Sequence, residues 1–210
     1  MENETFDKHR VISFSDAVFS IAMTLLVLEV VIPSYKELKT GNTLVILQNR
    51  IPSFIGLVVS FMVTALYWIA HMRIMKYVSI INSKLLWYNI FLLFFIVLLP
   101  FSTAFYVKGF GYNGPFAFYC FNLSAIGFFN YLLNVYVTKK EKGLTGITPL
   151  LGRYFRVKAL NAFLIWAMAG CLAFIFPIIA RFLFVLLFIF EFILIKYFKK
   201  KLQQEKITIE

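Results

Sequence analysis

The chain has 210 residues, of which 61% are hydrophobic and only 15% are charged. Soluble domains are about half apolar and about a quarter charged, so the composition excludes an ordinary soluble domain and predicts an all-α integral membrane protein. The net charge of +11 does not indicate nucleic-acid binding, because the basic residues lie between long apolar runs, as membrane topology requires.

Six apolar runs are separated by charged and turn residues, and each is long enough for a transmembrane helix. The predicted spans are 11–32, 52–70, 85–106, 116–137, 159–176 and 178–195. Pro52 is expected in the first turn of the second helix, where a missing N–H is harmless, with residues 44–50 as a weakly amphipathic lead-in. Pro100 predicts a kink or an early end within the third span.

The connections predict the orientation of the chain. Residues 34–42 read as a polar connection, 108–115 as a glycine-rich turn and 138–158 as a basic loop. This arrangement places 16 of the 21 Lys and Arg residues on one side, together with both ends of the chain. Because Lys and Arg are retained on the cytoplasmic side, both termini are predicted to be cytoplasmic. Residues 1–198 are expected to form one six-helix domain, and 199–210 a basic cytoplasmic tail that either anchors the topology or contacts anionic lipid.

The first span carries an aliphatic stripe at helical spacing. Ala17, Ile21, Leu25 and Leu28 share one face, with Ser20 and Thr24 at its edge. Packing or lipid contact is the usual reason for such a stripe. Here Asp16 and Glu29 bracket it, which suggests that water reaches both ends. If several copies of this helix met on a symmetry axis, the large aliphatic side chains would form rings, a hydrophobic constriction that can gate by dewetting.

Polar residues near the cytoplasmic ends of three spans are expected to meet. Arg10, Ser15 and Asp16 begin the first span, His71 ends the second and Asn89 begins the third. They predict a buried polar network that fixes the rotation of the first helix. His71 has two readings, a structural hydrogen-bonding residue or a proton sensor. Glu191 has two candidate roles in the sixth span, a subunit contact or an ion pair with Arg181.

The sequence contains few motifs for a carbonyl ion filter, metal binding or catalysis. Residues 109–112, GFGY, distantly resemble a carbonyl potassium filter, but Lys108 precedes them and they are expected to form a simple turn. Cys120 and Cys171 lie in apolar runs without metal-ligand spacing and are expected to be small buried residues. Enzyme signatures such as HExxH, GxSxG or a Walker loop are missing, so no enzyme, cofactor or metal site is predicted.

At Arg10-x-x-x-Phe14-Ser15-Asp16 the sequence resembles the transmembrane protein 175 family of potassium channels. Trp68-x-x-His71, Asn89 and the LPFST of residues 99–103 follow in the family's order. The resemblance implies a potassium-permeable pore lined by the first helix of each subunit, without a carbonyl filter. It puts Ile21 at the narrowest ring of the pore, with Leu25 and Leu28 further out. It also places Phe14 and Trp68 with the buried polar network.

A single six-helix repeat resembles the prokaryotic form, which implies a homotetramer in the plasma membrane with potassium ions as the permeant species. Two rival readings stay open. One is a proton-coupled secondary transporter in which Asp16 and His71 carry protons, and the other is a scaffold protein without transport activity. Secondary transporters usually show internal repeats and interrupted helices, which are not evident in this sequence beyond Pro100.

Overall fold

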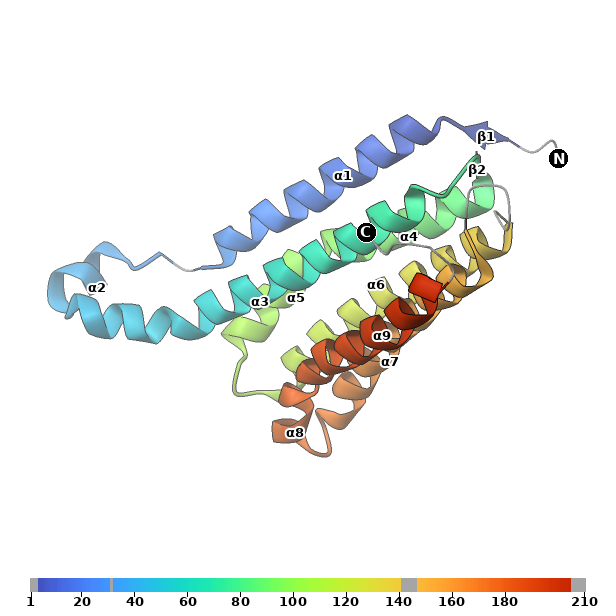
Figure 1. Ribbon diagram of the computed structural model, residues 1–210. Helices are drawn as coiled ribbons and strands as arrows, with labels where there is room; N and C mark the ends of the chain where they lie inside the picture. The colour runs from blue at the N-terminus through green and yellow to red at the C-terminus, as the bar shows by residue number, and fades with distance from the viewer. Residues whose placement is uncertain (1–3, 31, 141–146, 205–210) are drawn as a thin grey trace.

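The structure is a computed structural model that describes residues 4–30, 32–140 and 147–204. The regular elements of the described residues are helices and one pair of two-residue strands (Figure 1). In chain order the elements are β1 (Thr5–Phe6), α1 (Lys8–Leu25), η1 (Leu26–Glu29), α2 (Tyr35–Thr40), α3 (Thr43–Met75), β2 (Ile81–Asn82), α4 (Ser83–Val97), α5 (Leu99–Lys108), α6 (Asn113–Lys140), α7 (Pro149–Leu172), α8 (Pro177–Phe182) and α9 (Phe184–Gln204).

The first predicted span is shorter as an α-helix than expected. Asp7 caps its start by accepting a hydrogen bond from the backbone N–H of Arg10 at 2.8 Å. The α-helix ends at Leu25 and continues as the 3-10 segment η1, after which Val30 is extended. Leu28 therefore lies on a tighter turn than Ile21 and Leu25.

The predicted polar connection contains a short helix, α2. Ser34 and Glu37 form a capping box there, and Arg50 reaches Glu37 at 3.3 Å. The backbone and side-chain hydrogen bonds from Ser34 hold the pKa of Glu37 below its ordinary value of 4.5. The prediction for Pro52 is wrong: α3 begins at Thr43, so Pro52 lies inside the helix and not in its first turn, and the lead-in at residues 44–50 belongs to the same helix.

The break predicted near Pro100 is confirmed. α4 ends at Val97, α5 begins at Leu99, and the two form one apolar segment from Ser83 to Lys108. Proline cannot donate a backbone hydrogen bond, so it is placed in the first turn of α5.

The boundaries of the last helices differ from the prediction. α7 begins at Pro149 because Thr148 caps it by accepting a hydrogen bond from the Leu151 N–H at 3.2 Å. Much of the predicted basic loop is therefore helical, and its residues 141–146 lie outside the described part. The sixth predicted span is divided at Leu183 between α8 and α9. The predicted tail begins inside α9, but its residues 205–210 and the side chains from Lys199 onward are not described.

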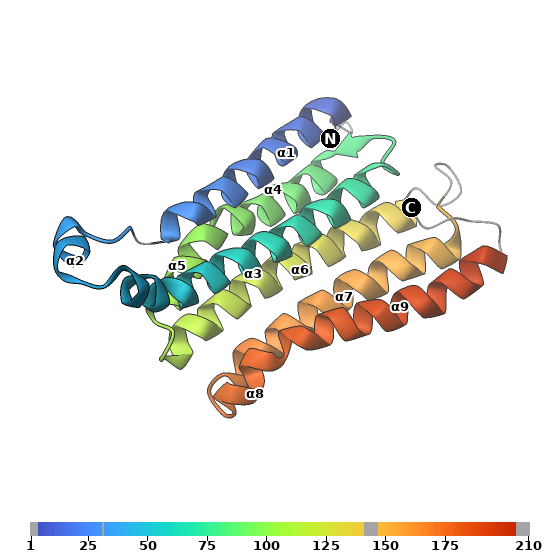
Figure 2. The same ribbon diagram turned by 60° about the vertical axis from the view of Figure 1, so that its left-hand side comes forward.

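The helices lie roughly alongside one another, with α1 packed on α3, α4 and α5 and with α9 beside α7 (Figure 2). A glycine allows α6 and α7 to approach closely, because a Cβ at Gly127 would lie 3.0 Å from the backbone of Phe163. Pairing of β1 with β2 brings the start of α1 to the α3–α4 connection. Among the described residues, five helical segments are long and apolar enough to cross a membrane; α8 and α9 are not among them.

Candidate functional site: the first helix and its polar anchor

α1 has two faces of different character. Ser15, Phe19, Ala22 and Leu26 are buried against the rest of the chain. The opposite face is uncovered. Its exposed residues are Ser13, Phe14, Ala17, Ser20, Ile21, Thr24, Leu25 and Leu28. The predicted stripe is therefore directed away from the chain's own core, with exposed fractions of 58% for Ile21, 41% for Leu25 and 72% for Leu28.

A buried chain of hydrogen bonds joins α1, α4 and α3. The Ser15 hydroxyl donates to the carbonyl of Val11 at 2.8 Å and accepts from Asn89 Nδ2 at 2.9 Å. Asn89 Oδ1 in turn accepts from His71 Nε2 at 2.8 Å. All three polar side chains are at most 1% exposed. Because the Asn89 bonds cross to the other two helices, the chain fixes both the depth and the rotation of α1.

Asp16 makes a second bond between α1 and α3. Its Oδ1 accepts from the indole Nε1 of Trp68 at 2.8 Å. The bond is charge-assisted and lies in a partly buried position, one residue along from Ser15. Trp68 and His71 are three residues apart on α3. The Asp16–Trp68 bond and the Ser15–Asn89–His71 chain therefore hold α1 at neighbouring positions.

Arg10 and Phe14, which were predicted to join a buried network, have exposed side chains in the structure. Arg10 is exposed and Phe14 is 60% exposed. The reason is helical spacing, since Arg10, Phe14, Ala17 and Ile21 follow one another at intervals of three or four and share the uncovered face. Both side chains line an open cavity of about 390 Å³ between α1 and α4.

The sequence reading missed a second buried polar cluster, between α3, α5 and α6. Ser60 Oγ accepts from Thr103 Oγ1 at 2.9 Å and lies 3.0 Å from Tyr119 Oη. Asn122 Nδ2 donates to Ser102 Oγ at 3.1 Å. Ser102 and Thr103 belong to the LPFST segment that carried part of the family resemblance. The signal for their partners was weak, because single Ser, Tyr or Asn residues in an apolar run are common on packed helices.

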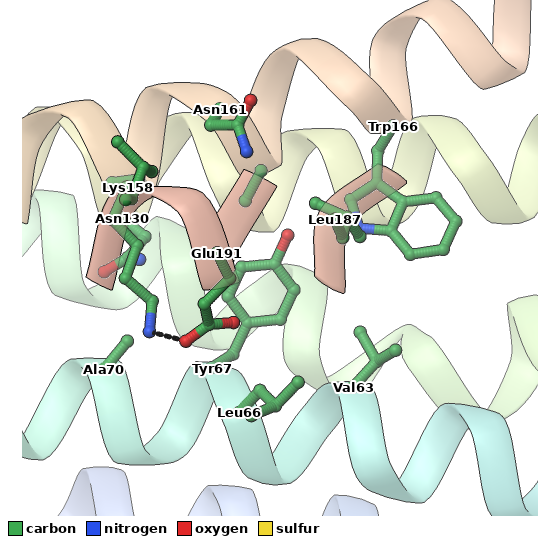
Figure 3. Close-up of a pocket in the computed structure, with 13 residues that line it drawn as sticks. Val63, Leu66, Tyr67, Ala70, Asn130, Lys158, Asn161, Trp166, Leu187 and Glu191 are labelled. Atoms are coloured by element: carbon green, nitrogen blue, oxygen red, sulfur yellow. Dashed lines mark hydrogen bonds and ion pairs between the residues drawn. The ribbon is translucent and has the colours of Figure 1, made fainter. Parts of the chain in front are cut away.

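Glu191 pairs with Lys158 and not with Arg181. Figure 3 shows this ion pair beside a small cavity between α3, α6, α7 and α9, with Tyr67, Asn130 and Trp166 among its walls. Arg181 instead donates to the carbonyl of Phe110 at 2.9 Å, with its guanidinium 5.3 Å from that ring's centroid. The predicted turn at residues 109–112 is thereby tied to α8.

The arrangement offers no chemistry of metal binding within the described ranges 4–30, 32–140 and 147–204, where no group of three His, Cys, Asp or Glu residues could hold an ion. The distinguishing feature of the site is the way in which α1 is held. A helix with an uncovered aliphatic face is fastened by its other face through buried polar bonds. The side chain of Glu29, the predicted outer end of the stripe, is outside the described atoms.

Taken with its five apolar segments, the fold is that of a multi-pass, all-helical membrane protein. Residues 10–100 match the model of the family described as endosomal/lysosomal potassium channel TMEM175. The resemblance expected from the sequence is therefore confirmed over this segment, which contains the whole anchor from Ser15 to Asn89.

Curated relatives match about half of the chain. A potassium channel of Chamaesiphon minutus is 35% identical over 101 residues, which is 48% of this chain and 50% of the relative. One from Chryseobacterium sp. (strain P1-3) is 34% identical over 96 residues, 46% of this chain and 47% of the relative. The aligned part of this chain thus spans about half the length of the curated relatives it matches.

Solved structures extend the likeness of fold to most of the chain. The crystal structure of a lysosomal potassium-selective channel TMEM175 homolog from Chamaesiphon minutus has a TM-score of 0.75 at 24% identity, covering 89% of this chain and 97% of that one. A variant of the potassium channel MtTMEM175, solved in complex with a nanobody fusion protein, has a TM-score of 0.63 at 20% identity over 89% and 93% of the two chains. These likenesses concern the fold.

Proposed function

We propose that the protein is a potassium-permeable cation channel in which α1 of each subunit lines a central pore. One observation carries the proposal: the aliphatic face of α1 is uncovered while its opposite face is fastened by Ser15, Asn89 and His71. A helix inside a core has its rotation set by packing on all sides, and a helix that only met lipid on this face would not require a fixed rotation. A pore helix does, because a small turn would remove a ring from the axis.

In a homotetramer, the uncovered faces of four copies would meet and cover one another. Ile21, Leu25 and Leu28 would then form successive rings, with Ile21 nearest the anchor as the narrowest. An ion must shed water to pass such a ring, and potassium holds its water less tightly than sodium. No carbonyl replaces the lost water, so we expect a modest preference for potassium.

Ser20 and Thr24 would lie at the edge of this surface. Thr24 Oγ1 donates to the carbonyl of Ile21 at 2.8 Å, so its hydrogen is used within the helix. The hydroxyl oxygens therefore offer weak acceptors to a passing cation rather than a coordinating cage. The main barrier is thus assigned to the aliphatic rings.

The assembly we propose has six spans per subunit, with α8 and α9 together as the sixth, and both termini in the cytoplasm of a prokaryotic cell. The charge distribution supports this orientation. Within the described residues, the start of α1, the end of α3 with the connection that follows it, and the start of α7 carry the basic residues Lys8, Arg73, Lys76 and Arg153. A channel of this kind would not be an enzyme.

A proton-coupled transporter is the second candidate, and one observation favours it. His71 is buried beside Asp16, and its Nδ1 has no hydrogen-bond partner among the described residues. Such a nitrogen could take up a proton during transport. The first candidate is preferred because Asn89 and Trp68 hold His71 and Asp16 in fixed positions within the packed helices.

Reconstitution in a planar bilayer distinguishes the candidates. Discrete single-channel steps with a potassium reversal potential support the channel, slow saturable flux that follows a proton gradient supports the transporter, and absence of either supports a scaffold. Asp16→Ala should reduce the yield of tetramer or abolish conductance. Normal assembly together with normal currents would contradict the role of the anchor.

The pore assignment is tested by Ile21→Asn and Leu25→Asn. Each should raise the current and reduce the preference for potassium over sodium, because a polar ring holds water. Ile193→Asn on α9 is the matched control, since Ile193 is 52% exposed against 58% for Ile21. If all three variants conduct like the wild type, α1 does not line the pore.

A further inference from the structure

A third cavity, separate from the face of α1, opens where α6 ends and α7 begins. Its volume is about 450 Å³. The residues that line it are Tyr131, Val135, Thr138, Lys139, Ile147, Thr148, Pro149, Gly152 and Arg156. It lies where two of the apolar segments reach their limits, because one ends at Lys139 and the next begins at Pro149. This is the depth at which lipid headgroups meet a membrane protein.

Two cationic side chains face this cavity. Lys139 is exposed, and Arg156 is partly buried. Among the residues that the structure describes, neither lies within ion-pair distance of a carboxylate. By contrast, the nearby Lys158 is neutralised by Glu191. The cavity therefore holds positive charge that the described side chains do not offset.

The guanidinium of Arg156 is held in place. Thr138 Oγ1 donates to the carbonyl of Asn134 at 2.7 Å, and the same oxygen accepts from Arg156 Nη1 at 2.8 Å. One edge of the guanidinium is used in this way, and its other donors are left for a ligand. A fixed, planar donor group is well suited to two oxygens of one anion.

α6 and α7 lie close together at the floor of the cavity. A Cβ at Gly152 would lie 3.3 Å from Thr138 Cβ and 3.4 Å from Ile147, so this glycine allows α7 to sit close to α6. Val135, Ile147 and Pro149 give the walls an apolar part, and Tyr131 adds a hydroxyl. Charge and apolar surface thus lie side by side, as an amphiphile requires.

We propose that this cavity binds the phosphate group of an anionic phospholipid, with Lys139 and Arg156 as its ligands and the apolar wall against its glycerol and upper acyl region. Basic pockets between transmembrane helices recognise anionic headgroups in this way. The proposal needs α6 and α7 to span a membrane, but it does not need the chain to conduct. Lipid binding and ion conduction can therefore fail independently.

The test is lipid binding by the full chain in detergent, measured by native mass spectrometry and by thermal shift. Phosphatidylglycerol should bind more tightly than phosphatidylcholine and raise the melting temperature. The double variant Lys139→Gln, Arg156→Gln should lose about tenfold or more in affinity for phosphatidylglycerol. Arg153→Gln removes one positive charge from an exposed position on α7 outside the cavity, so it should keep the preference.

Inorganic phosphate forms a separate arm of the experiment. Stabilisation by millimolar phosphate that the double variant loses would support the anion site and identify free phosphate as a ligand. Equal preference for phosphatidylglycerol in the wild type and the double variant, without any effect of phosphate, would overturn the proposal. Should the double variant fail to fold, Lys139→Gln alone tests the site, since its exposed side chain makes no hydrogen bond within the described atoms.

Discussion

Two buried asparagines, one in each half of the molecule, use their side chains in different ways. In the first half, Asn89 of α4 bonds to Ser15 of α1 and His71 of α3, so each bond joins two helices. In the second half, Asn134 donates to the carbonyl and side chain of Asn130, one turn earlier on α6. Both asparagines are buried, yet only one of them connects helices at that point.

The difference is between polar bonds that set the rotation of a helix and polar bonds that only satisfy side chains within one helix. The bonds between Asn130 and Asn134 lie within α6 and do not set its rotation, which depends on contacts with other helices, such as the close approach of Gly127 to the backbone of Phe163. Bonds between α1, α3 and α4 specify one rotation even though half of α1 has no cover.

The largest effect is expected for Asn89→Leu. The variant leaves Ser15 and His71 buried without their shared partner, and we expect a loss of about 2–4 kcal/mol in the free energy of unfolding. Asn134→Leu makes the same chemical change inside α6 and should cost clearly less. Unfolding in mixed micelles, titrated with sodium dodecyl sulfate, measures both. Equal losses would show that the location of the bonds does not matter.

An intermediate effect is expected at the ion pair that joins helices in the second half. Glu191→Ala leaves Lys158 unpaired between α7 and α9 (Figure 3). Because both side chains retain about a quarter of their exposure, we expect a loss of about 2 kcal/mol, below the value for a fully buried pair.

The control is the double variant Lys158→Met, Glu191→Leu, which removes both charges. It should be more stable than Glu191→Ala if the cost arises from an uncompensated charge. The same micelle titration measures it. A double variant that is the less stable of the two would mean that the pair contributes net attraction, and that α9 depends on it.

A smaller effect is expected for Trp68→Phe, which removes the donor to Asp16 and keeps an aromatic ring. Asp16 is only partly buried, so water replaces some of the lost bond and the cost should be about 1 kcal/mol. Trp87→Phe on α4 is the matched control, because Trp87 is 56% exposed. Thermal unfolding followed by fluorescence compares them. Identical shifts would argue that the Asp16 bond adds nothing to the anchor.

The sequence predicted the parts of this comparison that depend on periodicity and charge. The aliphatic stripe of α1, the break at Pro100 and the glycine-rich turn follow from local rules that act within one helix. The partner of Glu191 does not follow from them. The charge pattern places Lys158 in a loop, because a basic residue normally marks the end of a span, whereas Thr148 starts α7 well before it.

The exposure of Arg10 and Phe14 was also not evident from the motif. A shared motif suggests a shared location, but positions 10 and 14 lie on the uncovered face and positions 15 and 16 point toward the core side. The cluster of Ser60, Thr103 and Tyr119 required contacts between residues more than 40 positions apart. Such contacts depend on helix rotation and depth, which hydropathy does not determine.

The smallest effect concerns a polar cluster of the first half that is local, the capping box of α2. The folded-state pKa of Glu37 is lowered by hydrogen bonds from Ser34, so its contribution to the helix is present above pH 4.5 and is lost as the pH falls through the lowered value. Hydrogen exchange at residues 35–40, corrected for intrinsic rates, should show weaker protection in acid while α1 is unchanged. Glu37→Gln should abolish this pH dependence. If the variant retains it, the carboxylate is not the group that titrates, and α2 is held by the rest of the first half rather than by its own cap.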